Sequence, residues 1–378
     1  MKKLGLYLHI PFCKSKCLYC DFCSLPNAAD DMVAQYVNWL SGELERQAEQ
    51  CAEYEADTVY FGGGTPTALP DGMLERLLDT VFRHYHVAPD AEITAECNPA
   101  TADGARFLSM RRAGFNRLSI GLQSAQEREL KALGRLHGYG QFCDTWEQAL
   151  AAGFSNLSAD VMFGIPYQTE ESFADTLEKL CRLAPKHLSA YALTVEPGTP
   201  FGRRGEERLC LPDEEAVRRM YLTMIGRLAE AGLQQYEISN FAVPGYESRH
   251  NLKYWNAEEY LGFGPAAHSD FGGVRFGYEA DVRRCLNNGS LAFSEQSRPT
   301  AEERKNEYVM LQMRLREGLR REEMDRRFGS GASEGFEKAL ERYVPGGFVR
   351  RTGHGFAFTP EGMLVSNTIL SEILEFSS

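Results

Sequence analysis

The chain has 378 residues, with 41 Lys and Arg against 53 Asp and Glu, which gives a formal net charge of −12 at pH 7. This acidity argues against a nucleic-acid partner, because protein surfaces that bind nucleic acids carry an excess of positive charge. No apolar run approaches the roughly 20 residues that span a membrane, so we expect no transmembrane segment. The apolar start, from Leu4 to Phe12, lacks a signal-peptide cleavage site, which predicts a cytoplasmic protein with reduced cysteines.

In the first half of the chain, short apolar segments alternate with longer amphipathic ones. The predicted strands are Gly5–Ile10, Thr58–Phe61, Glu92–Glu96, Arg117–Gly121, Leu157–Phe163 and His187–Leu193. The predicted helices are Met32–Glu49, Met73–His84, Ala102–Ala113, Gln141–Ala152 and Glu171–Leu183. This alternation predicts repeated βαβ units with a parallel sheet. Six strands are too few for an eight-stranded barrel, so we expect an α/β fold with a partial (β/α)6 barrel and ligands at the carboxyl ends of its strands.

After Pro197 the alternation stops. Helices are predicted at Asp213–Ala231, Ala301–Glu317, Arg321–Arg327, Gly335–Arg342 and Glu361–Phe376, and strands at Gln235–Ile238, Gly347–Thr352 and Gly355–Pro360. The helices and hairpin that follow Pro299 resemble a winged-helix unit. We therefore expect a barrel at 1–240, a connecting region at 241–298 and a small carboxyl-terminal α+β domain at 299–378.

Three cysteines, Cys13, Cys17 and Cys20, have C-x3-C-x2-C spacing. A short loop with this spacing can direct three thiolates at one [4Fe-4S] cluster, whose fourth iron then has no protein ligand. An open iron indicates ligand binding or chemistry. Cys23 would close the cluster if it were a ligand, and we expect it to stay outside. Zinc is the competing interpretation, but these cysteines are too compact for two separated C-x2-C pairs.

Three successive glycines, Gly62, Gly63 and Gly64, follow the second predicted strand. Glycines let a backbone approach a ligand closely and expose its amide and carbonyl groups. The run is not a phosphate-binding P-loop, because the lysine of that motif is absent. In a barrel whose first loop holds the cysteines, the run indicates a ligand site beside the cluster.

The cysteine loop and the glycine run together resemble the radical S-adenosylmethionine (SAM) superfamily. In that superfamily SAM chelates the open iron, and its reductive cleavage gives a 5′-deoxyadenosyl radical. The resemblance implies a [4Fe-4S] cluster on Cys13, Cys17 and Cys20. It also implies SAM contacts at Tyr7, Tyr19, Gly63, Gly64, Thr65, Glu96, Gln123, Arg135, Asp160 and Thr194. Most of these residues lie at or just beyond predicted strand ends, as a barrel site requires.

The run from Tyr7 to Cys13 is similar to oxygen-independent coproporphyrinogen III oxidases, and this resemblance extends over nearly the whole chain. Two departures argue against the oxidative decarboxylation that those enzymes perform. The oxidases have a fourth cysteine two positions after the third, where this chain has Phe22. They also have a long extension before the segment that begins here at Tyr7.

The segment from His250 to Trp255 fits an H-N-x-x-Y-W pattern. It resembles the marker of HemW-type haem chaperones, the non-oxidase branch of the same family. The resemblance implies haem contacts at His250, Tyr254 and Trp255, because imidazole is a common haem ligand and aromatic rings pack on porphyrins. The implied partners are haem and an unidentified haem-accepting protein, reached by transient association with a membrane face. Two alternatives stay open: oxidation of coproporphyrinogen III, and a radical SAM enzyme with another substrate in which His250–Trp255 is structural.

Overall fold

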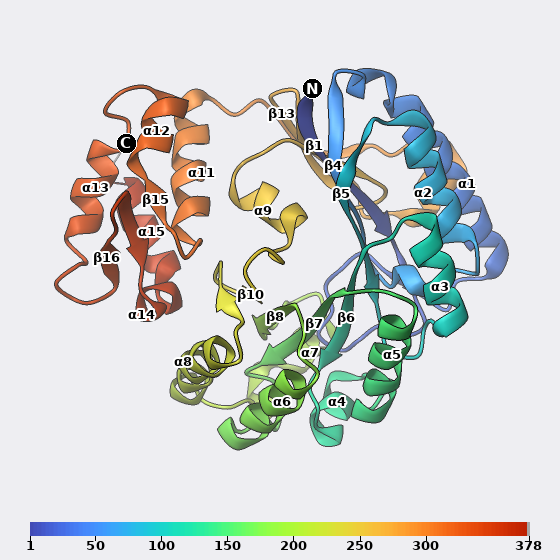
Figure 1. The fold of residues 1–378 in the computed structure, drawn as a ribbon, viewed down its shortest axis with the longest axis horizontal. Coiled ribbons are helices and arrows are strands. Elements are labelled where there is room, and N and C mark those ends of the chain that lie inside the picture. The colour runs from blue at the N-terminus through green and yellow to red at the C-terminus, as the bar shows by residue number, and fades with distance from the viewer. Residues whose placement is uncertain (376–378) are drawn as a thin grey trace.

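The computed structural model describes residues 1–375, which form one large curved sheet, a layer of helices outside it and a small domain beside it (Figure 1). The sheet has the strand order β14-β13-β12-β11-β1-β4-β5-β6-β7-β8-β10-β9. Its parallel core consists of β1 (Lys2–Ile10), β4 (Tyr54–Gly63), β5 (Val87–Cys97), β6 (Arg117–Gln123), β7 (Asn156–Phe163) and β8 (His187–Ala192). The expected α/β fold with a partial (β/α)6 barrel is confirmed.

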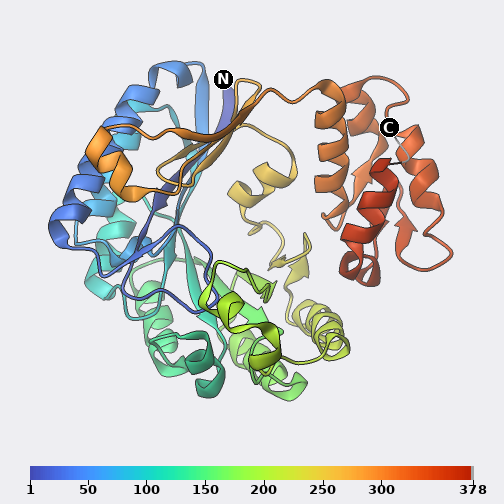
Figure 2. The same cartoon turned by 180° about the vertical axis from the view of Figure 1, so that it is seen from behind.

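Helices cover the convex face of this sheet in both views (Figures 1 and 2). They are α1 (Asp30–Gln47), α2 (Met73–His84), α3 (Gly104–Ala113), α4 (Glu127–Leu133), α5 (Tyr139–Ala151) and α6 (Glu170–Arg182). The five predicted helices of this half lie close to their predicted bounds. The unpredicted α4 has 7 residues, too few for an amphipathic period to stand out.

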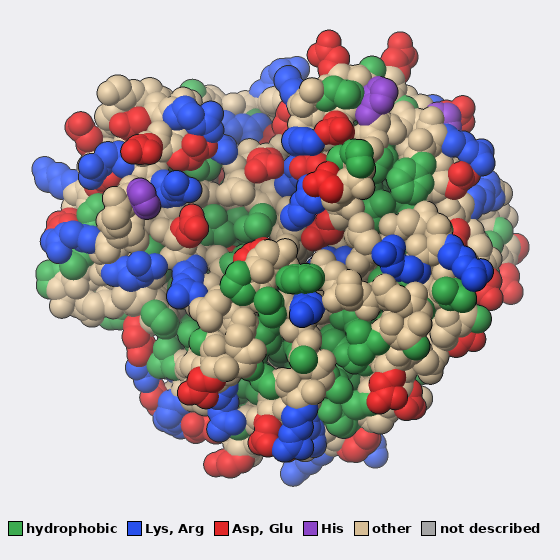
Figure 3. Space-filling view, in the orientation of Figure 1, with side chains coloured by type: hydrophobic (Ala, Val, Ile, Leu, Met, Phe, Trp, Pro, Cys, Tyr) green, Lys and Arg blue, Asp and Glu red, His purple; other side chains and the backbone are tan. Residues whose placement is uncertain are grey.

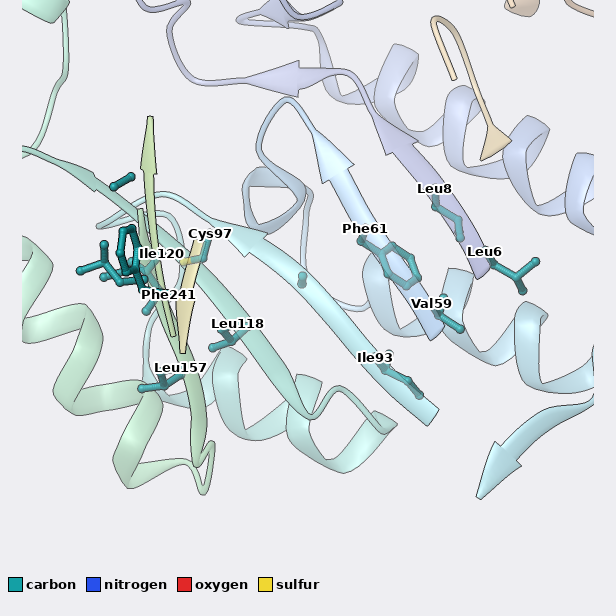
Figure 4. Close-up of a cluster of buried hydrophobic side chains, with 14 of the residues drawn as sticks. Leu6, Leu8, Val59, Phe61, Ile93, Cys97, Leu118, Ile120, Leu157 and Phe241 are labelled. Carbon is teal, nitrogen blue, oxygen red and sulfur yellow. The ribbon is translucent and has the colours of Figure 1, made fainter. Parts of the chain in front are cut away.

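Alternation along the strands separates an apolar outer layer from a polar interior. On β6, Leu118 and Ile120 are fully buried and belong to the cluster of apolar side chains in Figure 4. Arg117 and Ser119, which alternate with them, line the inside of the barrel. The sequence therefore places charge and hydroxyl groups where a closed barrel would have an apolar core.

The β1 edge of the sheet is extended by strands from the connecting region. β11 (Tyr260–Phe263) pairs in parallel with β1, and β12 (His268–Phe271), β13 (Val274–Tyr278) and β14 (Phe293–Ser297) follow in antiparallel order. The same region contains α9 (Arg249–Trp255) and α10 (Val282–Asn288). Figure 1 shows α9 on the open side of the barrel, facing the small domain.

The opposite edge of the sheet ends in two short strands, β10 (Asn240–Ala242) and β9 (Gln234–Gln235). The predicted strand at Gln235–Ile238 is therefore wrong in extent. Glu237 makes only an isolated bridge with Leu315. Its carboxylate accepts the backbone N–H of Ser239 at 3.1 Å, which holds this stretch in a turn.

The carboxyl-terminal domain packs helices on a small sheet with the order β15-β17-β16. Its elements are α11 (Ala301–Met313), β15 (Leu319–Arg320), α12 (Arg321–Phe328), α13 (Glu334–Glu341), β16 (Val349–Arg351), β17 (Gly355–Phe358), α14 (Pro360–Leu364) and α15 (Ser366–Glu375). The single helix predicted at Glu361–Phe376 is instead two, because Val365 leaves helical geometry with φ −111° and ψ 18°. Phe376 lies outside the described residues. α11 ends before the predicted Glu317, because Leu315 joins the bridge to Glu237.

The remaining elements connect these parts. They are β2 (Phe12–Cys13), β3 (Leu25–Pro26), α7 (Pro200–Arg204) and α8 (Glu214–Glu230). Among residues 1–375, no helix combines the length and the hydropathy that crossing a bilayer requires. Figure 3 shows basic and acidic side chains interspersed over the face that it presents.

Candidate functional site

A cavity of about 530 Å³ opens at the carboxyl ends of the parallel strands, where ligands of α/β barrels bind. The three predicted cluster ligands line this cavity: Cys13, Cys17 and Cys20. Most of the predicted SAM contacts line it too: Tyr19, Gly63, Gly64, Thr65, Glu96, Gln123, Arg135 and Asp160. Residues far apart in the sequence therefore line one cavity.

The cysteine loop is closed at its base by a two-residue ladder between β2 and β3. Leu25 donates its backbone N–H to Pro11 O at 2.6 Å, and Asn27 donates to Cys13 O at 3.1 Å. Cys23 lies on this loop, but it packs against the apolar core and does not line the cavity. Its carbonyl oxygen hydrogen-bonds His9 Nε2 at 2.8 Å. The loop thus presents three thiols to the cavity and turns the fourth away.

Two of these sulfurs accept hydrogen bonds from the cavity wall. Thr65 Oγ1 donates to Cys13 Sγ at 3.5 Å, and Arg135 Nη1 donates to Cys17 Sγ at 3.4 Å. Burial raises the pKa of the Cys13 and Cys20 thiols. Hydrogen bonds of this kind stabilise sulfur that carries negative charge, as it does when it ligates iron.

The donor set suits a cluster better than a single ion. Among residues 1–375, no three His, Cys, Asp or Glu side chains converge as a one-metal site requires. A cubane cluster binds each thiolate to a different iron, so its three sulfurs need not meet at one point. Three thiols on one wall of a cavity, two of them hydrogen-bonded, therefore fit a [4Fe-4S] group.

The glycine run joins the end of β4 to the cysteine loop. Gly64 donates its backbone N–H to Ile10 O at 2.9 Å, and Thr65 donates to Phe12 O at 2.7 Å. A Cβ at Gly64 would lie 2.7 Å from Ile10 O, too close for any other residue. Gly63 has φ +107°, a conformation that L side chains rarely adopt. Both glycines are thus required by the backbone geometry at the cavity.

Glu96 and Asp160 place two carboxyl groups in the cavity. Glu96 accepts hydrogen bonds from Tyr60 Oη at 2.9 Å and from the backbone N–H of Gly63 at 3.1 Å. Burial, and then the charge of Asp160, raise the pKa of Glu96 to about 7. Asp160 accepts from Ser119 Oγ at 2.8 Å, and burial raises its pKa as well. A cationic ligand group beside Glu96 would favour its charged form.

Arg135 connects the cysteine loop to the strand ends. Its Nη2 donates to Asn98 Oδ1 at 2.7 Å and to Gly121 O at 2.8 Å. Asn98 in turn donates to Thr65 Oγ1 at 2.7 Å. A continuous network thus runs from Cys17 through Arg135 and Asn98 to Thr65. Asn98 was not predicted from the sequence, although its position just after the β5 strand end is a signal that could have identified it.

Two predicted SAM contacts do not line the cavity. Tyr7 lies on β1, where its ring stacks on those of Tyr60, at 6.1 Å, and His250, at 6.4 Å. Thr194 lies exposed just beyond the end of β8. Of the residues brought in, Gln123 has φ +70°, a strained backbone of the kind that clusters at ligand sites.

The three predicted haem contacts all lie on α9. His250 is 1% exposed. Its Nδ1 and Thr58 Oγ1 hydrogen-bond at 2.8 Å, and its Nε2 and Tyr254 Oη do so at 2.8 Å. Burial, and then the charge of Lys253, lower the pKa of His250 to about 3, so the ring is neutral. Both nitrogens are therefore occupied in this conformation, whereas Trp255 is only half-buried.

Helix α9 is held at both ends by different parts of the molecule. The Glu92 carboxylate of β5 accepts the backbone N–H groups of Arg249 and His250, at 3.2 and 3.1 Å. At the other end, Gln312 of α11 donates to Trp255 O at 2.9 Å. Asn251, in the first turn of α9, lines the cavity. The helix thus lies between the cavity and the carboxyl-terminal domain.

Comparison with known proteins agrees with this architecture. The family model of the radical SAM superfamily matches residues 7–180, and that of the HemN C-terminal domain matches residues 300–365. The structure of coproporphyrinogen III oxidase (HemN) from Escherichia coli, described as a radical SAM enzyme, superimposes with a TM-score of 0.85. It is 23% identical and covers 98% of this chain and 90% of its own, which shows a shared fold.

Curated relatives match over almost their entire length. The heme chaperone HemW of Escherichia coli K12 is 35% identical over 377 residues, which are 98% of this chain and 98% of that protein. The heme chaperone HemW of Bacillus subtilis 168 is 32% identical over 373 residues, 97% of this chain and 98% of that protein. The chain therefore belongs to the HemW family of the radical SAM superfamily.

Proposed function

We propose that this protein is a cytoplasmic haem chaperone, which binds haem, a [4Fe-4S] cluster and SAM and passes haem to an acceptor protein. The observation that carries the proposal is the near-full-length relationship to proteins named heme chaperone HemW. The H-N-x-x-Y-W segment supports it, because α9 borders the cavity through Asn251. The acceptor is unidentified, and transient contact with a membrane face is part of the proposal.

The cluster would be held by Cys13, Cys17 and Cys20, and when reduced it supplies an electron that can cleave SAM. SAM would lie between the glycine run and Glu96, whose carboxylate would pair with the ammonium group of the ligand. The Arg135 network would fix Cys17 and the β6 strand end. Gln123 and Asp160 line the same cavity. The Asp160 carboxylate would accept hydrogen bonds from the ribose hydroxyls, and the Gln123 amide would donate hydrogen bonds to them or accept from them.

Haem would use α9 through the exposed parts of Tyr254 and Trp255. Ligation by His250 would require that its hydrogen bonds to Thr58 and Tyr254 break, because both ring nitrogens are occupied. Loss of a buried hydrogen bond of this kind costs about 1 kcal/mol. We therefore propose that His250 holds α9 in position in the absence of haem, and that it ligates haem only in a different, haem-bound conformation.

Haem titration tests this assignment. If His250 ligates the haem iron, His250→Ala should change the absorption spectrum of the bound haem. If His250 only positions α9, the substitution should weaken haem binding and leave that spectrum unchanged. Thr58→Val is the matched control, because it removes the Nδ1 partner and keeps the imidazole. If neither the wild type nor the Thr58→Val control bound haem, the result would contradict the proposed function.

A second function, oxidation of coproporphyrinogen III, is favoured by the shared fold with HemN over 98% of the chain. Its test uses the protein with the cluster reconstituted without oxygen, together with SAM, a reductant and coproporphyrinogen III. We expect no protoporphyrinogen. Multiple turnovers would overturn the chaperone assignment in favour of the enzyme.

A further inference from the structure

The floor of the cavity holds a charged group that neither the cluster nor SAM is proposed to use. Arg117 begins β6, and its side chain lines the cavity below Ser119 and Gly121, which follow on the same face of the strand. Arg117 is only 2% exposed. A guanidinium withdrawn from water in this way is strongly unfavourable unless a counter-charge is close.

That counter-charge is missing from the protein itself. Across the described chain, residues 1–375, no carboxylate forms an ion pair with Arg117, and its Nε has no hydrogen-bond partner. The positive charge of Arg117 acts to lower the pKa of two carboxyl groups, those of Glu96 and Asp160, without a direct contact. Their oxygens already accept hydrogen bonds from Tyr60, Gly63 and Ser119. Neither side chain is therefore a direct partner.

The neighbouring strands repeat this pattern. Thr94 on β5 and Asn156 on β7 stand in register on either side of Arg117. The side-chain oxygens Thr94 Oγ1 and Asn156 Oδ1 are also buried without a hydrogen-bond partner. Buried polar groups are almost always satisfied. Of these three groups, Arg117 is the one that lines the cavity, so a polar species that enters the cavity can satisfy its guanidinium directly.

We propose that Arg117 forms the centre of a monocarboxylate-binding subsite at the floor of the cavity. The planar guanidinium can bind a carboxylate through two parallel hydrogen bonds. A phosphate dianion is disfavoured, because the carboxyl groups of Glu96 and Asp160 line the same cavity. The subsite is separate from the proposed SAM contacts, which lie at the strand ends above it.

Two sources share this chemistry: a free monocarboxylate and a propionate side chain of haem. The second source rests on the proposed function, whereas the subsite itself does not. The first experiment uses the complete protein with its cluster and saturating SAM, so that the SAM carboxylate site is filled. Propionate is the probe, propionamide is its neutral isostere, and inorganic phosphate is the dianionic control.

We expect propionate to bind at least about tenfold more tightly than propionamide or phosphate, as charge-assisted hydrogen bonds imply. Arg117→Gln should weaken propionate binding by on the order of 10- to 100-fold, and Arg117→Lys should retain part of it. Propionate that binds no better than propionamide would overturn the proposal and leave the floor to ordered water. Equal propionate binding by wild type and Arg117→Gln would do the same.

Iron content and the unfolding temperature show whether Arg117→Gln folds. If it does not, the comparison of propionate with propionamide on the wild type still decides, and Arg117→Lys supplies a milder variant with an expected partial loss.

The second experiment compares haem with its dimethyl ester, in which both propionates are neutral. If haem supplies the carboxylate, esterification weakens binding to the wild type and has little effect on Arg117→Gln. Equal binding of haem and ester, with propionate binding still dependent on Arg117, assigns the subsite to a free carboxylate. Failure of haem to bind at all contradicts the proposed function, and the propionate result then stands alone.

Discussion

Arg135 and Cys17 form a hydrogen bond between guanidinium Nη1 and thiol Sγ at 3.4 Å, which links α4 and β6 to the cysteine loop across 118 residues of sequence. The second amino group of Arg135 is fixed by Asn98 and Gly121, so its direction is set before any iron arrives. A hydrogen-bond donor held in this way changes the reduction potential of an iron–sulfur cluster that the Cys17 sulfur ligates.

We expect Arg135→Met to shift the reduction potential of the bound cluster to more negative values, because a hydrogen bond to sulfur stabilises the more negatively charged, reduced state. Potentiometric titration followed by electron paramagnetic resonance measures the shift. Arg135→Lys keeps the positive charge and loses the planar guanidinium, so its reduction potential should lie between those of wild type and Arg135→Met. An unchanged potential at full iron content would contradict the role given to this hydrogen bond.

Cysteine substitutions separate the three cavity thiols from the fourth. Cys20→Ser should lose the cluster, because its sulfur faces the cavity, whereas Cys23→Ser should keep about four irons per chain, as a [4Fe-4S] cluster requires. Iron analysis and the visible absorption of the reconstituted protein measure both. The reverse result would show that Cys23 is a ligand and that the loop rearranges when it binds iron.

The glycine run can be tested against a glycine of similar backbone conformation elsewhere. A Cβ at Gly63, with φ +107°, would lie 2.4 Å from the His9 ring, whereas Gly72, with φ +81°, has nothing within 4 Å. Gly72→Ala should cost only the strain of its backbone, about 1 kcal/mol of unfolding free energy. Gly63→Ala should cost more and also abolish SAM binding, measured by calorimetry. Equal effects of the two substitutions would mean that the clash at Gly63 is relieved without harm.

Glu96 makes stability depend on pH in the protein without SAM. Its pKa is raised from 4.5 to about 7, so the folded state holds a proton that the unfolded state releases. The resulting stability is complete below pH 4.5 and is lost as the pH rises through 7. Glu96→Gln should therefore be more stable than wild type at pH 8, by on the order of 2 kcal/mol after allowance for water in the cavity. Urea unfolding at pH 5 and pH 8 measures this difference.

Glu237 is the matched control for Glu96. Burial raises its pKa to about 7 as well, but it lies outside the cavity. Glu237→Gln should change the pH dependence of stability in the same direction and leave SAM affinity intact, whereas Glu96→Gln should weaken SAM binding. If Glu96→Gln bound SAM as tightly as wild type, Glu96 would not be the partner of the ligand ammonium.

The sequence was informative where function depends on local spacing. The positions of Cys13, Cys17 and Cys20, the glycine run and the strand ends are set by neighbours in the chain, and most of these residues line one cavity. The strand bounds followed from short apolar runs, which must be buried under helices. All the expected SAM contacts were carried over from the family pattern, and two of them, Tyr7 and Thr194, lie away from the cavity wall in this structure.

Contacts between distant segments were beyond such an approach. His250 is held by Thr58, which precedes it by 192 residues, and no local pattern indicates that both imidazole nitrogens are occupied. Arg117 was also missed, although a period of two along the same strand places it on one face with Ser119 and Gly121. Its lack of a counter-charge depends on how the neighbouring strands β5 and β7 place their side chains, which only the folded structure reveals.

The two-residue ladder between β2 and β3 has a consequence for the assembly of the metal centre. It holds the ends of the segment 14–24 together without iron, so the chain entropy of closing that loop is lost during folding rather than during metal binding. The thiols then meet iron at a high effective concentration, in the manner of a chelating agent. Weakening the ladder should therefore slow cluster insertion before it affects the finished cluster.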